Sequence, residues 1–196
     1  MLITRSLLLV GSLASLLLAP MLIGGCGSTQ PAQQATADAK AAVPCAPDDE
    51  GCRSAAIAHD HIGAIKADVS AESVVASFGE PEKMGESWEE GATGMWVQDW
   101  HWPARGIEIA MGSTRKDGAQ SVYNYTVSAP FAGTTTRGIG IGATEAEVTK
   151  AYAGLADPSF TTGGKIFIAG SVYGGVFFNF DEGGRVESIF IGAGAE

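Results

Sequence analysis

The chain has 196 residues and a formal net charge of −10 at pH 7, with 12 Lys and Arg residues in all. Because nucleic-acid phosphates are bound by clustered basic side chains, this acidic chain with scattered basic residues is excluded as a nucleic-acid-binding protein. The same scarcity excludes a polybasic membrane patch, and the length suffices for one domain or two small ones.

The N-terminus has the parts of a secretory signal. Arg5 precedes an almost purely apolar run over residues 7–23, and two glycines separate this run from Cys26. A basic start, an apolar middle and a small-residue exit are typical of signal peptides. The cysteine directly after the small residues resembles the lipobox of bacterial lipoproteins, with Ile23 where that family usually has Leu.

The lipobox resemblance implies that residues 1–25 are removed and that Cys26 carries lipid, which attaches the protein to a membrane. Gly27 is not the aspartate that retains such proteins in the inner membrane, so the resemblance implies the outer membrane of a bacterial cell envelope. Two alternatives stay open. Residues 6–25 are long enough to remain as a transmembrane anchor, since about 20 apolar residues span a bilayer, and the protein can also be secreted in soluble form.

Residues 26–61 are predicted to form a flexible tether. This stretch is rich in Ala, Gln, Pro and Asp and has almost no large apolar side chain before Ile57. Such a segment cannot bury enough surface to order itself. About 35 flexible residues give a root-mean-square reach of roughly 30–35 Å, so the folded part would stand off the membrane.

Cys45 and Cys52 are predicted to form a disulfide within this tether. If Cys26 is lipidated, these two thiols remain as a pair in an oxidising compartment. A metal site with the acidic residues 48–50 is the first alternative, and it is disfavoured because soft thiolates and hard carboxylates prefer different metals. Two free thiols are the second alternative.

An α+β domain is predicted from residue 62 onward, built as an internal duplication of residues 62–130 and 131–196. Each half begins with a short amphipathic helix. Ser70 caps the first helix, and Thr144 with Glu147 forms a capping box at the start of the second. Gly79 and Gly154 end the two helices.

Three antiparallel strands are predicted after each helix, with turn residues between the last two. The expected strands are 95–102, 106–111 and 122–127 in the first half, and 165–169, 175–180 and 186–191 in the second. We expect the two sheets to join or to pack side by side, with the helices on one face.

Three short patterns mark this helix-and-hairpin arrangement. They are the helix start Gly-x-Thr-x-x-Glu-Val at 142–148, the glycine helix ends, and the hairpin Phe-Asp-x-x-Gly-x-Val at 180–186. Over about residues 62–191 the chain resembles the small repeat of the BamE outer-membrane assembly lipoprotein and of the β-lactamase inhibitory protein. Since none of these patterns is a catalytic signature, the resemblance implies a protein-binding module.

The first predicted strand carries a cluster of tryptophans. Alternation along a strand places four side chains on one face, namely Trp96, Gln98, Trp100 and Trp102. Exposed, these indoles would offer a surface to a protein partner or a sugar ring, and buried, they would form the core. If Trp100 is core, the opposite face with Asp99 and His101 is the one in contact with water.

No catalytic residue, metal site or cofactor is predicted, and an enzyme is not expected. His59-Asp60-His61 offers two imidazoles, but no third ligand is evident unless His101 approaches. The glycine run 138–142 lacks the Gly-Lys-Ser/Thr of phosphate loops. The chain also lacks a Gly-x-Ser-x-Gly motif.

These patterns lead to one main hypothesis and one alternative. The main hypothesis is a lipid-anchored envelope protein that binds another envelope or secreted protein and performs no catalysis. The alternative is a periplasmic binder of a small ligand or cell-wall glycan that uses the tryptophan strand.

Overall fold

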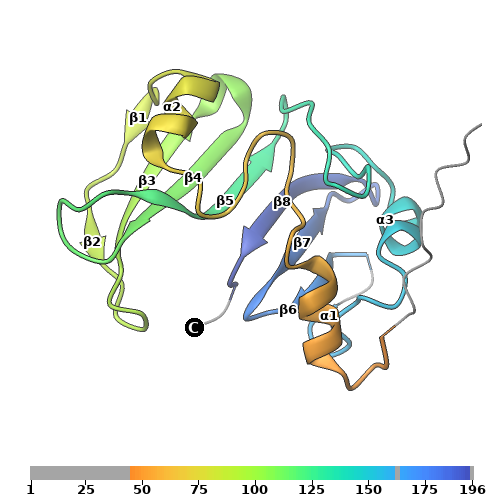
Figure 1. Ribbon diagram of the computed structural model, residues 1–196. Helices are drawn as coiled ribbons and strands as arrows, with labels where there is room; N and C mark the ends of the chain where they lie inside the picture. Colours follow the sequence, from red (N-terminus) through yellow and green to blue (C-terminus); the bar gives the residue numbers. More distant parts are fainter. Residues whose placement is uncertain (1–44, 162–163, 195–196) are drawn as a thin grey trace, which may run out of the picture. The chain divides into compact units, whose positions relative to one another are not determined.

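An antiparallel sheet organises the computed structural model, which describes residues 45–161 and 164–194 (Figure 1). In this described part the sheet has eight strands: β1 (Lys83–Met84), β2 (Trp88–Glu89), β3 (Trp96–Trp102), β4 (Ile107–Ser113), β5 (Ser121–Ser128), β6 (Ile166–Ser171), β7 (Gly174–Phe180) and β8 (Val186–Gly192). The described helices are α1 (Glu50–Ile57), α2 (Ala71–Phe78), α3 (Glu145–Ala151) and the 3-10 helix η1 (Pro103–Arg105). The predicted α+β class is confirmed.

Two three-stranded meanders join into one sheet. The strand order is β1-β3-β4-β5-β8-β7-β6, so the strands that follow α2 meet the strands that follow α3 where β5 pairs with β8. At this joint Val127 lies opposite Ile189 and Tyr125 lies opposite Ile191. The short strands β1 and β2 both pair with the outer edge of β3. An exposed strand edge invites pairing with other chains, so β1 and β2 protect this one.

The helix caps lie where the sequence predicts them. The Ser70 hydroxyl accepts a hydrogen bond from the Ser73 N–H at the start of α2, and Gly79 ends this helix with a φ of 77°. At the start of α3, Thr144 and Glu147 satisfy each other's backbone N–H groups in a capping box. Both helices are short, so packing of their apolar side rather than helix propensity holds them in place.

The core lies between these two helices and one face of the sheet. Phe78 of α2 has its ring centroid 6.1 Å from that of Trp102 on β3. Tyr152, directly after α3, has its ring centroid 5.0 Å from that of Phe178 on β7. Trp102, Tyr152 and Phe178 belong to one continuous buried cluster, and Phe78 packs against it, so the two meanders share a single core.

The predicted tether is wrong for residues 45–61, because this stretch contains α1 and packs on the sheet. Arg53 is 5% exposed, and its Nε donates a hydrogen bond to the Gly170 carbonyl at 3.1 Å. Ile57 is buried in the same core as α2 and α3. The composition of the segment does not predict this helix, because the contacts that hold α1 come from β6, more than a hundred residues away in sequence.

The predicted disulfide between Cys45 and Cys52 is confirmed, with a Cα–Cα distance of 5.7 Å. It joins the residues ahead of α1 to the first turn of this helix, where Asp49 caps the helix by accepting from the Cys52 N–H. Because such bonds persist in oxidising compartments, the disulfide indicates an extracytoplasmic location.

The predicted signal segment 1–25, Cys26 and residues 27–44 of the tether lie outside the described residues. Among the helices that the structure describes, none has the length and apolar character needed to cross a membrane.

Candidate functional site

The face of the sheet opposite α2 and α3, here called the outer face, carries the polar side chains of β3, β4 and β5. Because side chains alternate along a strand, the burial of Trp100 and Trp102 on the core side turns Asp99 and His101 to the outer face. This agrees with the expectation from the sequence that a buried Trp100 would leave those two residues on the face in contact with water. The accessible polar side chains of these strands therefore lie on the outer face.

Cross-strand pairing aligns these side chains in a row. His101 on β3 lies opposite Glu108 on β4, and Glu108 lies opposite Thr126 on β5. Directly opposed residues of neighbouring strands have their side chains in contact distance. Glu108 thus has an imidazole on one side and a hydroxyl on the other.

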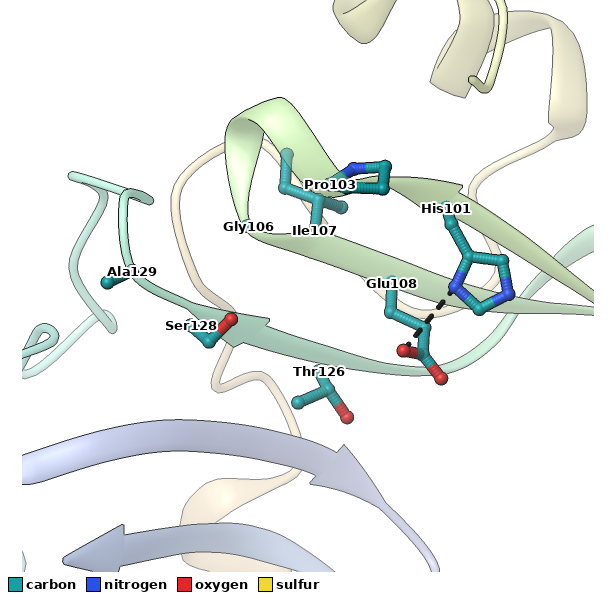
Figure 2. Close-up of a pocket in the computed structure, with 8 residues that line it drawn as sticks. All are labelled: His101, Pro103, Gly106, Ile107, Glu108, Thr126, Ser128 and Ala129. Atoms are coloured by element: carbon teal, nitrogen blue, oxygen red, sulfur yellow. Dashed lines mark ion pairs between the residues drawn. The ribbon is translucent and has the colours of Figure 1, made fainter. Parts of the chain in front are cut away.

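A depression of about 290 Å³ lies at this row (Figure 2). Its walls come from the ends of β3, β4 and β5: His101, Pro103, Gly106, Ile107, Glu108, Thr126, Ser128 and Ala129. His101 Nδ1 lies 3.4 Å from Glu108 Oε2, and these two side chains are 31% and 56% exposed. They are the ionisable groups of this lining, so with a neutral imidazole the depression carries one negative charge.

Gly106 permits the close approach of chain segments that shapes the depression. Its φ is 64°, and a Cβ at this position would lie 2.1 Å from the Ser128 carbonyl oxygen. The Ser128 N–H donates to the Gly106 carbonyl at 2.9 Å. Any larger residue here would push the end of β5 away and widen the depression.

The row does not assemble a nucleophile and its base. His101 and Thr126 lie two strands apart with Glu108 between them, which corresponds to about 9–10 Å across the sheet. A hydroxyl activated by histidine needs hydrogen-bond contact of about 3 Å. The arrangement can therefore bind a donor group at Glu108, but it does not activate Thr126.

The same row continues into an apolar region on β8, β7 and β6. Thr126 lies opposite Phe190, and Phe190 lies opposite Phe177, with their ring centroids 5.2 Å apart. Phe177 and Ile168 are only 6% and 3% exposed, and Gly194 packs against the Phe177 ring. This part of the outer face is a second small core, so the accessible surface is the polar half.

The four tryptophan-strand residues named from the sequence fall into two groups. Trp100 and Trp102 are buried at 7% and 1% exposure, which supports the core interpretation for these two rings. Trp96 and Gln98 instead line a separate depression of about 300 Å³ on the core side, near the N-terminus of α2, where the Ala71 N–H donates to the carbonyl of the lining residue Gln120. A continuous exposed platform of three indoles is therefore not formed, and a binding role for Trp96 and Gln98 stays a prediction.

His59, Asp60 and His61 lie at the end of the α1 segment, without a third histidine beside them. Asp60 accepts from Arg137 Nε at 3.0 Å and from the Thr136 hydroxyl at 2.8 Å. Within the part of the chain that the structure describes, no group of three or more His, Cys, Asp or Glu side chains could hold a metal ion.

Arg137 was not singled out from the sequence, although it joins Asp60 to the core. Its guanidinium carbon lies 5.1 Å from the centroid of the Tyr152 ring, and its Nη2 donates to the Ala56 carbonyl. Burial raises the pKa of Tyr152, so its hydroxyl stays protonated. The cluster fastens the end of α1 to α3, which is a structural role that only the three-dimensional contacts reveal.

No family model matches the chain, and no curated protein matches it. A solved structure of an extracellular protein containing an SCP domain from Bacillus anthracis str. Ames is similar at 15% sequence identity and a TM-score of 0.41. The similarity covers 64% of this chain and 44% of that chain.

The resemblance drawn from the sequence, to a lipobox lipoprotein with a BamE-like or β-lactamase-inhibitory-protein-like repeat, is wrong as a family assignment. Neither family is found by the comparisons. The patterns that carried the repeat part of this resemblance are the helix start at 142–148, the glycine helix ends and the Phe-Asp-x-x-Gly-x-Val hairpin at 180–186. These are local signals for starting a helix or turning a strand, and unrelated folds use them for the same purpose.

Proposed function

We propose that this protein is an extracytoplasmic binding module that holds a basic side chain of a protein partner at the outer-face depression. One observation carries the proposal. The exposed carboxylate of Glu108 stands between the imidazole of His101 and the side of Thr126, in a lining with no Lys or Arg.

The chemistry of the depression favours an ammonium or guanidinium group. A carboxylate accepts several hydrogen bonds, and His101 uses one direction of Glu108. Thr126 and Ser128 add hydroxyl acceptors within the same depression. Charge-assisted hydrogen bonds of this kind are about twice as strong as neutral ones. The net charge of −10 would also attract a basic partner from solution at low ionic strength.

Site-specific crosslinking tests the proposal. A photo-crosslinking amino acid at Ser128 is expected to capture a partner in intact cells, whereas the same group at Glu182, in the exposed β7–β8 turn, is not. Glu108→Gln is expected to weaken binding of the purified partner about tenfold or more, since it removes a charged hydrogen-bond acceptor.

Glu182→Gln is the matched control, because it removes the same charge from an exposed position outside the depression. Equal affinity of the Glu108→Gln and Glu182→Gln variants would contradict the proposal. So would a partner whose contact surface has no Lys or Arg.

We also propose that a lipid on Cys26 holds the protein at a membrane of the cell envelope, the outer membrane where there are two. The apolar run over residues 7–23 and the glycines before Cys26 support this proposal. Mass spectrometry of protein from its native host is expected to find a mature N-terminus at a modified Cys26. Cys26→Ser should move the protein to the soluble fraction, and an intact Met1 or an unmodified Cys26 thiol would contradict the anchor.

We further propose that the two halves are a tandem repeat. A helix and a three-stranded antiparallel meander occur in the same order over residues 71–128 and 145–192, with β1, β2 and η1 added in the first span, and this shared order supports a duplication. An alignment of many homologous sequences would test it. The two halves should then be more similar to each other than either is to unrelated helix-and-hairpin segments.

A further inference from the structure

We propose that the depression lined by Trp96 and Gln98 is a binding site for a neutral pyranose sugar. This site, here called the Trp96 pocket, has a volume of about 300 Å³. That volume is at the lower end of the range for small-molecule sites, which corresponds to a single sugar ring. The Trp96 pocket lies on the other face of β3 from His101, so it is separate from the depression at Glu108.

The aromatic surface of the pocket is supplied by Trp96. Its indole is half-buried, whereas Trp100 and Trp102 on the same strand face are enclosed in the core. Lys116 lies over the ring, with its Nζ 5.3 Å from the ring centroid. A cation at this distance is attracted to the ring and occupies one of its faces, so a sugar would stack on the part of Trp96 that lines the pocket, whose lining does not include Lys116.

The polar groups of the pocket are held in place by a network of side-chain amides. Gln98 Oε1 accepts from Trp100 Nε1 at 3.0 Å and from Gln120 Nε2 at 3.2 Å. Gln98 Nε2 donates to the Gly85 carbonyl at 3.0 Å. Because its Nε2 is directed at Gln98, the Gln120 amide is oriented and its oxygen remains as an acceptor. Orienting the polar groups in advance lowers the entropic cost of binding.

The charges of the pocket favour a neutral ligand rich in hydroxyls. Arg115 and Asp117 both line it, from the turn between β4 and β5, and their charges cancel. Ser113, at 5% exposure, forms part of the lining beside them. A guanidinium, a carboxylate, an amide and an aromatic ring together match a molecule that has donors and acceptors around an apolar ring face.

The turn between β4 and β5 lies close to Ser113, which forms part of the pocket lining. Asp117 has a φ of 57°, and a Cβ at Gly118 would lie 2.4 Å from the Ser113 hydroxyl. The Asp117-Gly118 pair therefore provides the backbone conformation that brings Arg115 and Asp117 to the same pocket as Trp96.

The test uses the indole N–H resonances of the folded protein in two-dimensional NMR. The probes are the methyl pyranosides of glucose, galactose, mannose and N-acetylglucosamine, with cyclohexanol as a ring of similar size that has one hydroxyl. At least one glycoside is expected to shift the Trp96 signal, and the Trp100 signal through Gln98, with a Kd of about 1 mM for a ligand of this size. The Trp88 and Trp102 signals should stay in place, since neither residue lines the pocket.

Two variants locate the binding. Trp96→Ala should abolish the shift of the Trp100 signal, and Gln120→Ala should weaken binding about five- to tenfold through the loss of one hydrogen-bonding amide. Trp88→Ala is the matched control, because it removes an exposed indole outside the pocket. If Trp96→Ala does not fold, Gln120→Ala and Arg115→Ala carry the test.

Three outcomes would overturn the proposal. One is the absence of any shift of Trp96 with all four glycosides up to about 100 mM, a hundredfold above the expected Kd. Another is equal binding of cyclohexanol, because a site that hydrogen-bonds hydroxyl groups rejects an analogue that lacks them. The third is unchanged affinity in Gln120→Ala. None of these results bears on the crosslinking at Ser128, so the two proposals fail separately.

Discussion

At the scale of single residues, the burial of Trp102 determines which side of β3 belongs to the core. Its ring is 1% exposed, contacts Phe78, and donates through Nε1 to the Gly79 carbonyl at 3.2 Å. Trp102→Ala is expected to lower the free energy of unfolding by about 3–5 kcal/mol, since it empties a large buried volume.

Trp88→Ala provides the comparison, because Trp88 is 43% exposed on the short strand β2. Trp88→Ala should lower the free energy of unfolding by no more than about 1 kcal/mol. Urea unfolding followed by far-ultraviolet circular dichroism measures both variants without relying on indole fluorescence. Similar losses in the two variants would contradict the assignment of Trp102 to the core.

Arg53 is expected to stabilise the packing of α1 on the sheet as strongly as an apolar core residue would. Its guanidinium is buried, with Nε on the Gly170 carbonyl and Nη1 on the Pro47 carbonyl at 2.7 Å. Arg53→Ala should lower the free energy of unfolding by about 2–3 kcal/mol because both carbonyls lose a charged donor. The exposed Arg105 serves as the control, and Arg105→Ala should stay within about 0.5 kcal/mol in the same urea experiment. Equal stability of the two variants would mean that α1 does not depend on the buried guanidinium.

The alternation along β3 could be predicted from sequence, but the identity of the buried face could not. Residues 96–102 divide into two faces by periodicity alone, and both faces contain plausible core residues. The deciding contacts come from Phe78 and from the Gly79 carbonyl, which belong to another element. The Asp60–Arg137 ion pair was missed for the same reason, since the two residues lie 77 positions apart.

At the scale of elements, the capping box of α3 makes the stability of the protein depend on pH. The Thr144 N–H donates to the Glu147 carboxylate at 2.8 Å, and the Thr144 hydroxyl does so as well. These hydrogen bonds, first the backbone one, lower the pKa of Glu147 below its usual 4.5, and Arg185 adds to the effect. A lowered pKa in the folded state stabilises the protein above pH 4.5, and this contribution is lost as the pH falls through the folded value.

Glu147→Gln isolates this contribution. The wild type should be more stable than the variant near neutral pH, and the difference should shrink steadily as the pH falls below 4.5. Chemical unfolding at a series of pH values measures it, with Glu182→Gln as a control that should be independent of the cap. A difference that stays constant from pH 7 to about 3 would show that the carboxylate acts without ionising.

Elements with local signals were predictable, and elements held by distant contacts were not. Capping residues and turn glycines mark α2, α3 and both hairpins within a few positions of their observed bounds. The helix α1 also has a capping residue, Asp49, but it stands in a segment whose composition predicts disorder. The pairing of β5 with β8 has no local signal at all, because it joins strands about sixty residues apart.

At the scale of the whole molecule, the two meanders are expected to unfold as one cooperative unit. They share a sheet through the β5–β8 joint, and their buried side chains form one continuous cluster. Val127 and Ile189, which face each other at this joint, are both 0% exposed. A core common to both halves favours two-state unfolding of the domain that they form.

The distribution of tryptophan makes this cooperativity measurable. All four Trp residues lie between positions 88 and 102, so indole fluorescence reports on the first meander and the adjoining strand β2, whereas hydrogen exchange of β6–β8 amides reports on the second meander. The two probes should give the same free energy of unfolding. Ile189→Ala should lower both by the same amount, about 2–5 kcal/mol, although it lies outside the meander that contains the tryptophans. A fluorescence transition that stays at the wild-type midpoint, while β6–β8 lose protection, would mean that the halves fold independently and that the joint does not couple them.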